Sequence, residues 1–414
     1  MLAKLNDLGE EIALVPDSGV QFVDLALDLN KHRQLTRTFI ERVGQHSDGK
    51  EHRQLLRVPD IDDDAVLPRE FEAGRDDLLL DIDSRGALEI FLEKWIPVPF
   101  LRVKDGADWD HAIEFDEGPS NWARVRIVEI PDRVGQDGPS HRVIFAFDTA
   151  IEERKPNRPY VAPTLDDVTS PTVFRLARDA SKIGWFFSDT RSAAERETSR
   201  WFQGWVDDWL ISSYEEYMRV RYPKQAFDVN EMEYRLEHWM RYIALLETLQ
   251  AALAPPRVKF VDAISKSEDR DGPRVAPVSV DLVLDIGNSR TCGLLIESYP
   301  NASQIDLNNA LVLQLRDLQR PEHVYDDPFS SNVELASARF GRHDLARRSA
   351  RRNAFSWPTL VRVGPEALRL RSKNDGTGAE TGMSSPKRYL WDVDPVESPW
   401  EFQPGDYSLD RRPP

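Results

Sequence analysis

The segment from Val278 to Ser298 contains the residue types that bind phosphate groups. It reads VSVDLVLDIGNSRTCGLLIES, two apolar runs joined by the polar sequence GNSRT. A glycine in such a turn lets the backbone approach a ligand closely, and successive backbone amides can donate hydrogen bonds to phosphate oxygens. Each run has the length of a buried strand. The pattern predicts a hairpin with a phosphate-binding turn, and the alternative is an ordinary hairpin with a polar turn.

Each residue near the turn has an expected role in phosphate binding. The candidate binding residues are Asp285, Gly287, Asn288, Ser289, Arg290 and Thr291. Gly287 permits the close approach, and the three following amides, with the hydroxyls of Ser289 and Thr291, face the phosphate oxygens. The Arg290 guanidinium can pair with phosphate as a fork. Asp285 is the candidate metal ligand, because Mg²⁺ is held in nucleotide sites through one or two carboxylates and several waters.

The sequence VLDIGNSRTCGLLIE resembles the first phosphate motif of the superfamily of actin, sugar kinases and heat-shock-chaperone (DnaK-type) ATPases. In that superfamily the turn between the first two strands grips the nucleotide phosphates, which implies ATP and Mg²⁺ as cofactors. Two later segments, Ala338–Ala350 and Val361–Leu370, resemble the Gly-x-x-Ala segments of chaperone ATPase lobes. In both we expect a strand that ends in glycine, followed by a helical turn.

The sequence GMSSPKRYLWD at Gly382–Asp392 resembles the next segment of those ATPases, in which a lysine reaches the γ-phosphate. The resemblance implies that Lys387 is the catalytic lysine, since a cation there stabilises charge on the transferred phosphoryl group. The alternative for Lys387 and Arg388 is a solvated basic pair.

At a closer level, DIGNSRTCGLLIE and SSPKRYLWD behind an acidic amino-terminal region resemble the SrfB family of bacterial virulence factors. The resemblance implies a Gram-negative source and an actin/DnaK-like (RNase H-like) ATPase lobe. We also expect a protein partner, and a protein encoded in the same virulence operon is a candidate. The second phosphate motif and the adenosine motif of the superfamily do not follow Lys387. We therefore expect an amino-terminal portion of that architecture, and whether it is an enzyme stays open.

Two functions are alternatives to nucleotide binding. The first is a non-catalytic scaffold or interaction protein that keeps the lobe without turnover. The second is binding of a basic partner through the acidic region, because residues 1–277 have a net charge of −15 and residues 278–414 one of −2. Such binding would weaken steeply with salt.

Composition excludes several classes of protein. The 414 residues contain one cysteine, which excludes a disulfide framework and a cysteine-rich zinc site. The net charge of −17 opposes binding to nucleic acid or to an anionic membrane. The sequence contains no apolar run of the roughly 20 residues that a membrane-spanning helix needs. We expect a cytoplasmic protein that binds neither membrane nor nucleic acid.

The fold class expected from the patterns is mixed α/β and α+β. Four regions are expected: an acidic strand-rich region at 1–190, a helical pair with a following strand at 191–264, a linker at 265–278 and a partial ATPase lobe at 279–414. Within them, alternation predicts a half-buried hairpin of Trp122–Ile130 with His141–Thr149. Apolar residues at helical spacing predict helices over Trp201–Tyr222 and Phe227–Ala254, with their Trp and Tyr side chains in the core.

Overall fold

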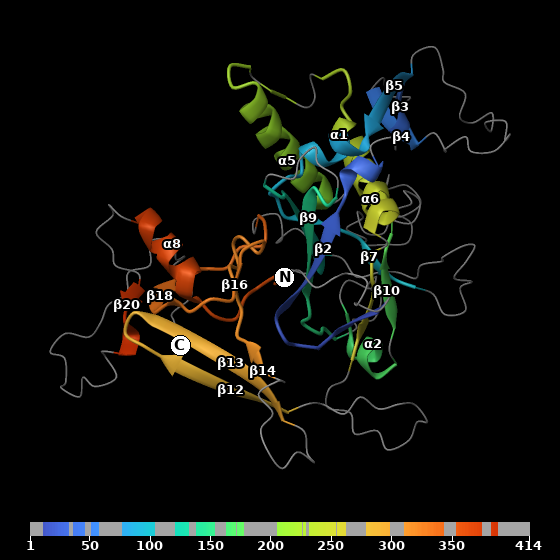
Figure 1. Ribbon diagram of the computed structural model, residues 1–414. Helices are drawn as coiled ribbons and strands as arrows, with labels where there is room; N and C mark the ends of the chain where they lie inside the picture. Colours follow the sequence, from blue (N-terminus) through green and yellow to red (C-terminus); the bar gives the residue numbers. More distant parts are fainter. Residues whose placement is uncertain are drawn as a thin grey trace. The chain divides into compact units, whose positions relative to one another are not determined.

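The computed structural model divides the chain into two compact units, which are described separately below (Figure 1). Unit 1 comprises Met1–Asp262 and Gly341–Phe355, and unit 2 comprises Ala263–Phe340 and Ser356–Pro414. The residues that the structure describes are 11–32, 36–45, 51–57, 77–103, 121–131, 138–153, 163–170, 172–177, 205–225, 227–228, 232–253, 255–261, 279–298, 310–342, 353–374 and 382–387. The linker predicted at 265–278 lies outside them. The expected mixed, strand-rich fold class is confirmed.

Unit 1 contains two four-stranded sheets. The first has the antiparallel order β2 (Val20–Leu27), β9 (His141–Asp148), β8 (Ala123–Glu129) and β6 (Ile96–Pro97). The second has the order β1 (Glu11–Leu14), β11 (Arg257–Phe260), β10 (Val173–Leu176) and β7 (Phe100–Arg102), and β1 is its parallel strand.

A smaller antiparallel sheet and several short helices complete the regular structure described in unit 1, besides its two long helices. The sheet has the order β4 (Glu51–Arg57), β3 (Thr36–Gln45) and β5 (Leu78–Asp83). The short helices are α1 (Ser84–Glu89), α2 (Leu165–Thr169) and the 3-10 helix η2 (Leu29–His32). Asp83 caps α1 by accepting a hydrogen bond from the Gly86 amide, which fixes where the helix begins.

The hairpin of β8 and β9 is confirmed, but its burial differs from the expectation. The strands pair from Ala123 with Phe147 to Glu129 with His141. Both faces are buried, although alternation had predicted one solvent-facing side. Arg124 shows how this is possible, because its guanidinium lies 4.0 Å from the ring centroid of Phe355 and 4.8 Å from that of Trp209. A buried cation that contacts two aromatic rings can occupy a position that the polar pattern assigned to solvent.

Two long helices form the helical pair, and both lie within unit 1. They are α5 (Trp205–Arg221) and α6 (Glu237–Leu253), and they contact each other. The second helix begins ten residues later than Phe227, where the apolar pattern had placed its start. The buried carboxylate of Glu41 on β3 accepts hydrogen bonds from the amides of Arg235 and Leu236 at this end. A long-range acceptor therefore helps to set the start of α6.

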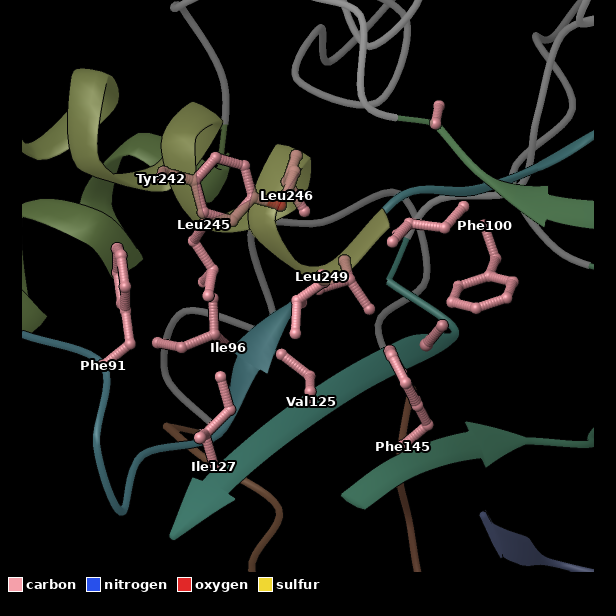
Figure 2. Close-up of a cluster of buried hydrophobic side chains, with 14 of the residues drawn as sticks. Phe91, Ile96, Phe100, Val125, Ile127, Phe145, Tyr242, Leu245, Leu246 and Leu249 are labelled. Carbon is pink, nitrogen blue, oxygen red and sulfur yellow. The ribbon is translucent and has the colours of Figure 1, made fainter. Parts of the chain in front are cut away.

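The core of unit 1 is rich in aromatic side chains, as the helical Trp and Tyr pattern predicted. Trp209, Trp239 and Tyr242 are all buried. The Tyr242 hydroxyl donates to the carbonyl of Pro97 at 2.7 Å, which satisfies its polar atom inside the core. Figure 2 shows Leu245, Leu246 and Leu249 of α6 gathered with side chains of the neighbouring strands, among them Ile96, Val125 and Ile127.

The described residues of unit 2 form small antiparallel sheets and the helix α8 (Gly364–Asn374). The first sheet has the order β12 (Ser279–Ile286), β13 (Arg290–Ser298) and β14 (Ala310–Val312), and β17 (Phe329–Ser330) also pairs with β13. The others are β15 (Leu315–Arg316) with β16 (Val324–Tyr325), and the order β19 (Val361–Val363), β18 (Asn332–Leu335), β20 (Gly382–Ser384). The helix packs against β17, β18 and β19.

The expected strand–glycine–helix segments are confirmed in one case out of two. Val361–Leu370 forms β19 and the start of α8, with Gly364 between them at a φ of +65°. In the other segment, the described residues Ala338–Arg342 contain no strand, and the rest of it lies outside the described residues. Val361–Leu370 has the Gly-x-x-Ala spacing and begins with the alternating Val–Arg–Val that pairs with β18, whereas in Ala338–Ala350 the next alanine lies five residues after Gly341.

The expectation of a buried strand is wrong for β12 and only partly met by β13, in which Gly293 and Ile296 are buried. Five apolar side chains of β12 are between 42% and 54% exposed, namely Val280, Leu282, Val283, Leu284 and Ile286. Continuous apolar runs predict strands buried on both faces, yet here neither face of β12 is buried. The strand assignment is nevertheless correct, because β12 pairs with β13 along its whole length, from Ser279 with Ser298 to Ile286 with Thr291.

Replacing Leu246 by alanine should lower the free energy of unfolding of unit 1 by about 2–5 kcal/mol, because a fully buried leucine leaves a cavity. The matched control is Val220→Ala on α5, whose side chain is 79% exposed and whose removal should change stability by less than about 0.5 kcal/mol. Urea unfolding followed by circular dichroism measures both. Equal losses in the two variants would contradict the core assignment.

Candidate functional site

The β12–β13 hairpin has the predicted position and the predicted turn. The strands pair in register up to Ile286 with Thr291, and Gly287, Asn288 and Ser289 form the turn. The Gly287 amide donates to the carbonyl of Arg290 at 2.9 Å. A Cβ atom at position 287 would lie 2.5 Å from that carbonyl oxygen, closer than real Cβ contacts. Glycine is therefore required here by the close approach of two backbone segments across the hairpin.

Ser331 joins this turn to a segment much later in the chain. Its amide donates to the carbonyl of Ser289 at 2.9 Å, and its hydroxyl donates to the carbonyl of Gly287 at 2.8 Å. Its own carbonyl accepts from the amide of Ser385 at 2.7 Å. The turn end of the β12–β13 ribbon accordingly lies beside β20, as Figure 1 shows.

The hydroxyl of Thr291 completes this set of hydrogen bonds. It lies 2.9 Å from the hydroxyl of Ser331. A serine hydroxyl has one proton, and that of Ser331 goes to the Gly287 carbonyl, which can only accept. Thr291 is therefore the donor to Ser331. Its proton is already engaged, so the Thr291 hydroxyl supports the turn through Ser331.

The remaining predicted residues at the turn are accessible. Asp285, Asn288, Ser289 and Arg290 are exposed. Within the described part of the chain, neither the Asn288 amide nor the Ser289 amide donates to a protein acceptor. Of the backbone donors around the turn, the Gly287 amide is engaged by Arg290. Two amides, one guanidinium and one carboxylate are thus open to a ligand at this corner.

The predicted lysine is placed on the same side of unit 2 by backbone contacts. Lys387 is half-buried and lies two residues after Ser385, whose amide contacts Ser331. Among the described residues, no hydrogen bond or ion pair links the Lys387 side chain to the turn. The structure therefore brings the two sequence motifs together through Ser331 without a direct contact of Lys387. Arg388 lies outside the described residues.

The site has one carboxylate suited to a metal. Among the described residues there is no group of three or more His, Cys, Asp or Glu side chains that could hold a metal ion. Mg²⁺ in nucleotide sites keeps several waters and takes one or two carboxylates together with phosphate oxygens. A single exposed carboxylate at Asp285 fits that mode of binding.

Helix α8 is held beside the site by a buried charged cluster. Asp317 is fully buried, and both of its carboxylate oxygens accept from Arg369 on α8 at 2.8 Å. The backbone amides of Gln319 and Arg320 donate to the same carboxylate. Because these bonds tie α8 to the loop after β15, they fix the helix that packs on β17, and β17 pairs with β13 at Arg290.

Glu366, in the first turn of α8, is the second acid of this cluster. It is 5% exposed, and its Oε1 atom has no hydrogen-bond partner. Burial, and after it the charge of Asp317, raise the pKa of Glu366 from its ordinary 4.5 to about 7, against smaller opposing effects of the Leu318 amide and of Arg362 and Arg369. The group is therefore protonated in the folded protein at mildly acidic pH.

No sequence pattern pointed to Ser331 or to the cluster around Asp317. Ser331 lies in the polar run SSN, which resembles many loops, and its partners are far away in sequence. Neither was among the residues predicted to act. Cys292, the single cysteine of the chain, is exposed.

A family model described as virulence factor SrfB matches residues 1–414. This chain belongs to the SrfB family of virulence factors. The match covers both units, so the hairpin, Ser331 and α8 all belong to the matched region of this SrfB-family protein. No curated protein and no solved structure matches the chain. None of the described helices is both long enough and apolar enough to cross a membrane.

Replacing Glu366 by glutamine should change how stability depends on pH. The pKa of Glu366 is about 7 in the folded protein and 4.5 in the unfolded chain. The stability that this difference contributes is fully present below pH 4.5 and is lost as the pH rises to about 7. Glu366→Gln mimics the neutral form at every pH. The variant should therefore gain stability over the wild type between pH 4.5 and 7, with a constant difference above pH 7.

Urea unfolding of both proteins from pH 5 to pH 8 measures this difference. The control is Asp327→Asn in the same unit, which removes an exposed carboxylate. A difference between Glu366→Gln and wild type that does not vary with pH would contradict the assignment.

Proposed function

We propose that the β12–β13 turn of this SrfB-family protein binds the phosphates of ATP together with Mg²⁺. The observation that carries the proposal is the pair of exposed amides at Asn288 and Ser289, which have no protein acceptor among the described residues, next to the exposed side chains of Arg290 and Asp285. Backbone amides that point outward from a glycine-containing turn form an anion site. In this proposal unit 2 acts as the first lobe of an actin/heat-shock-chaperone type protein.

Each residue of the turn has its own role in the proposed binding of ATP and Mg²⁺. The amides of Asn288 and Ser289 and the Ser289 hydroxyl donate to phosphate oxygens, and Arg290 adds a charge-assisted pair. Thr291 acts through Ser331, since its proton is donated there. Lys387 is proposed to face the terminal phosphate. Asp285 orients waters of the bound Mg²⁺, and the ion supplies the positive charge that balances the phosphates.

Calorimetry with ATP and Mg²⁺ on the whole chain tests the proposal. Asp285→Asn should weaken binding at least about tenfold when Mg²⁺ is present and little when EDTA removes it, because a lost charge-assisted contact is worth about 1.5–3 kcal/mol. The matched control is Asp281→Asn, on the same strand and the same face of the sheet, which should bind like the wild type.

Lys387→Ala adds a second readout in the same assay. If Lys387 faces the terminal phosphate, the variant should weaken ATP binding and leave ADP binding unchanged. No heat in the wild type, or equal binding by Asp285→Asn and Asp281→Asn, would remove the proposal.

A second candidate function is a non-catalytic scaffold that keeps the lobe and binds a protein partner in the cytoplasm. It is supported by the exposed apolar side chains of the β12–β13–β14 sheet. On one face these are Val280, Leu282, Leu284, Ile286 and Leu311. Contiguous apolar surface of this kind is typical of protein interaction sites. Absence of nucleotide binding in the wild type, with partner binding lost in Leu282→Lys, would favour this function.

A further inference from the structure

All the backbone and hydroxyl hydrogen-bonding groups of Ser331 contact either the turn or the Ser385 segment. The residue is 6% exposed. Three of its hydrogen bonds reach the hairpin, at Gly287, Ser289 and Thr291, and the fourth joins its carbonyl to the Ser385 amide. A buried residue with every polar group satisfied has one low-energy position. Ser331 therefore fixes the turn and the Ser385 segment relative to each other within unit 2.

The hydroxyl of Ser331 also sets the direction of a proposed ligand-binding amide. The carbonyl of Gly287 and the amide of Asn288 belong to the same peptide group. All described peptide bonds are trans, so these two groups point in opposite directions. Since the Gly287 carbonyl points toward the Ser331 hydroxyl, the Asn288 N–H points away from it. Removing that hydroxyl frees the peptide group to rotate.

Ser331 is also directly connected to the strands that carry the later motif. The next residue, Asn332, begins β18 and pairs with Ser384 on β20. The hydrogen bond from the Ser385 amide to the Ser331 carbonyl continues this pairing one residue further toward Lys387. Ser385 has a φ of +55°, an uncommon value for a residue other than glycine, so the chain turns sharply where Ser331 holds it.

We propose that Ser331 is a positioning residue that couples ligand binding at the β12–β13 turn to the placement of the Ser385–Lys387 segment. The coupling rests on the proposed function, because the ligand is the nucleoside triphosphate with Mg²⁺ assigned to that turn. A ligand that orders the turn orders the Ser385 segment through Ser331. Coupling between two sites is reciprocal, so a ligand that reaches Lys387 also holds the turn more firmly.

The neighbouring serine provides a matched control. The Ser330 hydroxyl is buried and has no hydrogen-bond partner, whereas that of Ser331 has two. Ser330→Ala and Ser331→Ala remove the same group from adjacent residues. Only the second variant breaks the link between the Gly287 carbonyl and the Ser331 hydroxyl. Ser331→Thr keeps a hydroxyl and should restore the wild-type behaviour.

Amide hydrogen exchange by mass spectrometry, with peptides covering the turn and residues 382–387, tests the coupling in the whole chain. Adding ATP and Mg²⁺ to the wild type and to Ser330→Ala should slow exchange of the 382–387 peptide at least about fivefold. In Ser331→Ala that slowing should be absent, and ATP affinity should fall about tenfold. Ser331→Ala that binds more weakly yet keeps the ligand-induced slowing at 382–387 would overturn the proposal.

The free protein separates this proposal from the proposed function. Without ligand, Ser331→Ala should speed exchange in both peptides relative to Ser330→Ala, because both are fixed by the same residue. Equal exchange in the two variants would overturn the link, whether or not ATP binds. Absence of ATP binding in the wild type would instead remove the proposed function and the ligand coupling while leaving the structural link supported. Should Ser331→Ala not fold, Thr291→Val, which removes the donor to Ser331, replaces it in the free-protein comparison.

Discussion

The carbonyl groups of Gly287 and Ser289 point out of the hairpin and must find donors, and this requirement organises the candidate site. Ser331 supplies both donors from one residue. The Gly287 amide is satisfied across the hairpin, whereas the amides of Asn288 and Ser289 have no protein acceptor among the described residues. The turn is therefore held on one side by Ser331 and exposed on the other.

The two units bury their apolar side chains to very different degrees. In unit 1 the helices and sheets enclose a large aromatic core, and even Arg124 is buried between two rings. In unit 2 the β12–β13–β14 sheet keeps many apolar side chains exposed, while two acids, Asp317 and Glu366 of α8, are buried, and Asp317 is bonded to Arg369 of the same helix. Unit 2 thus has rigid polar supports near the turn and an apolar surface elsewhere, a combination that suits ligand binding and protein binding alike.

Local patterns predicted the elements better than they predicted burial or boundaries. Alternation identified the β8–β9 hairpin, and the apolar runs around GNSRT identified β12 and β13. The same patterns did not predict which faces of these strands are buried, because both faces of β8 and β9 are buried and neither face of β12 is. The start of α6 was also misplaced, because the amides of the two residues before it are held by Glu41, far away in sequence. What covers a strand or caps a helix depends on residues outside the window that a local pattern samples.

The sequence by itself determined the β12–β13 hairpin, its glycine and the exposed polar turn, because short apolar runs on either side of a turn and a close backbone approach are local properties of the chain. It also determined, through motif resemblance, the family to which the chain belongs. Only the tertiary structure decided that Ser331 joins the turn to the Ser385 segment and that Glu366 lies buried beside Asp317. Hydrogen bonds and desolvation depend on which residues far apart in sequence are brought into contact by folding, and a local sequence pattern does not contain that information.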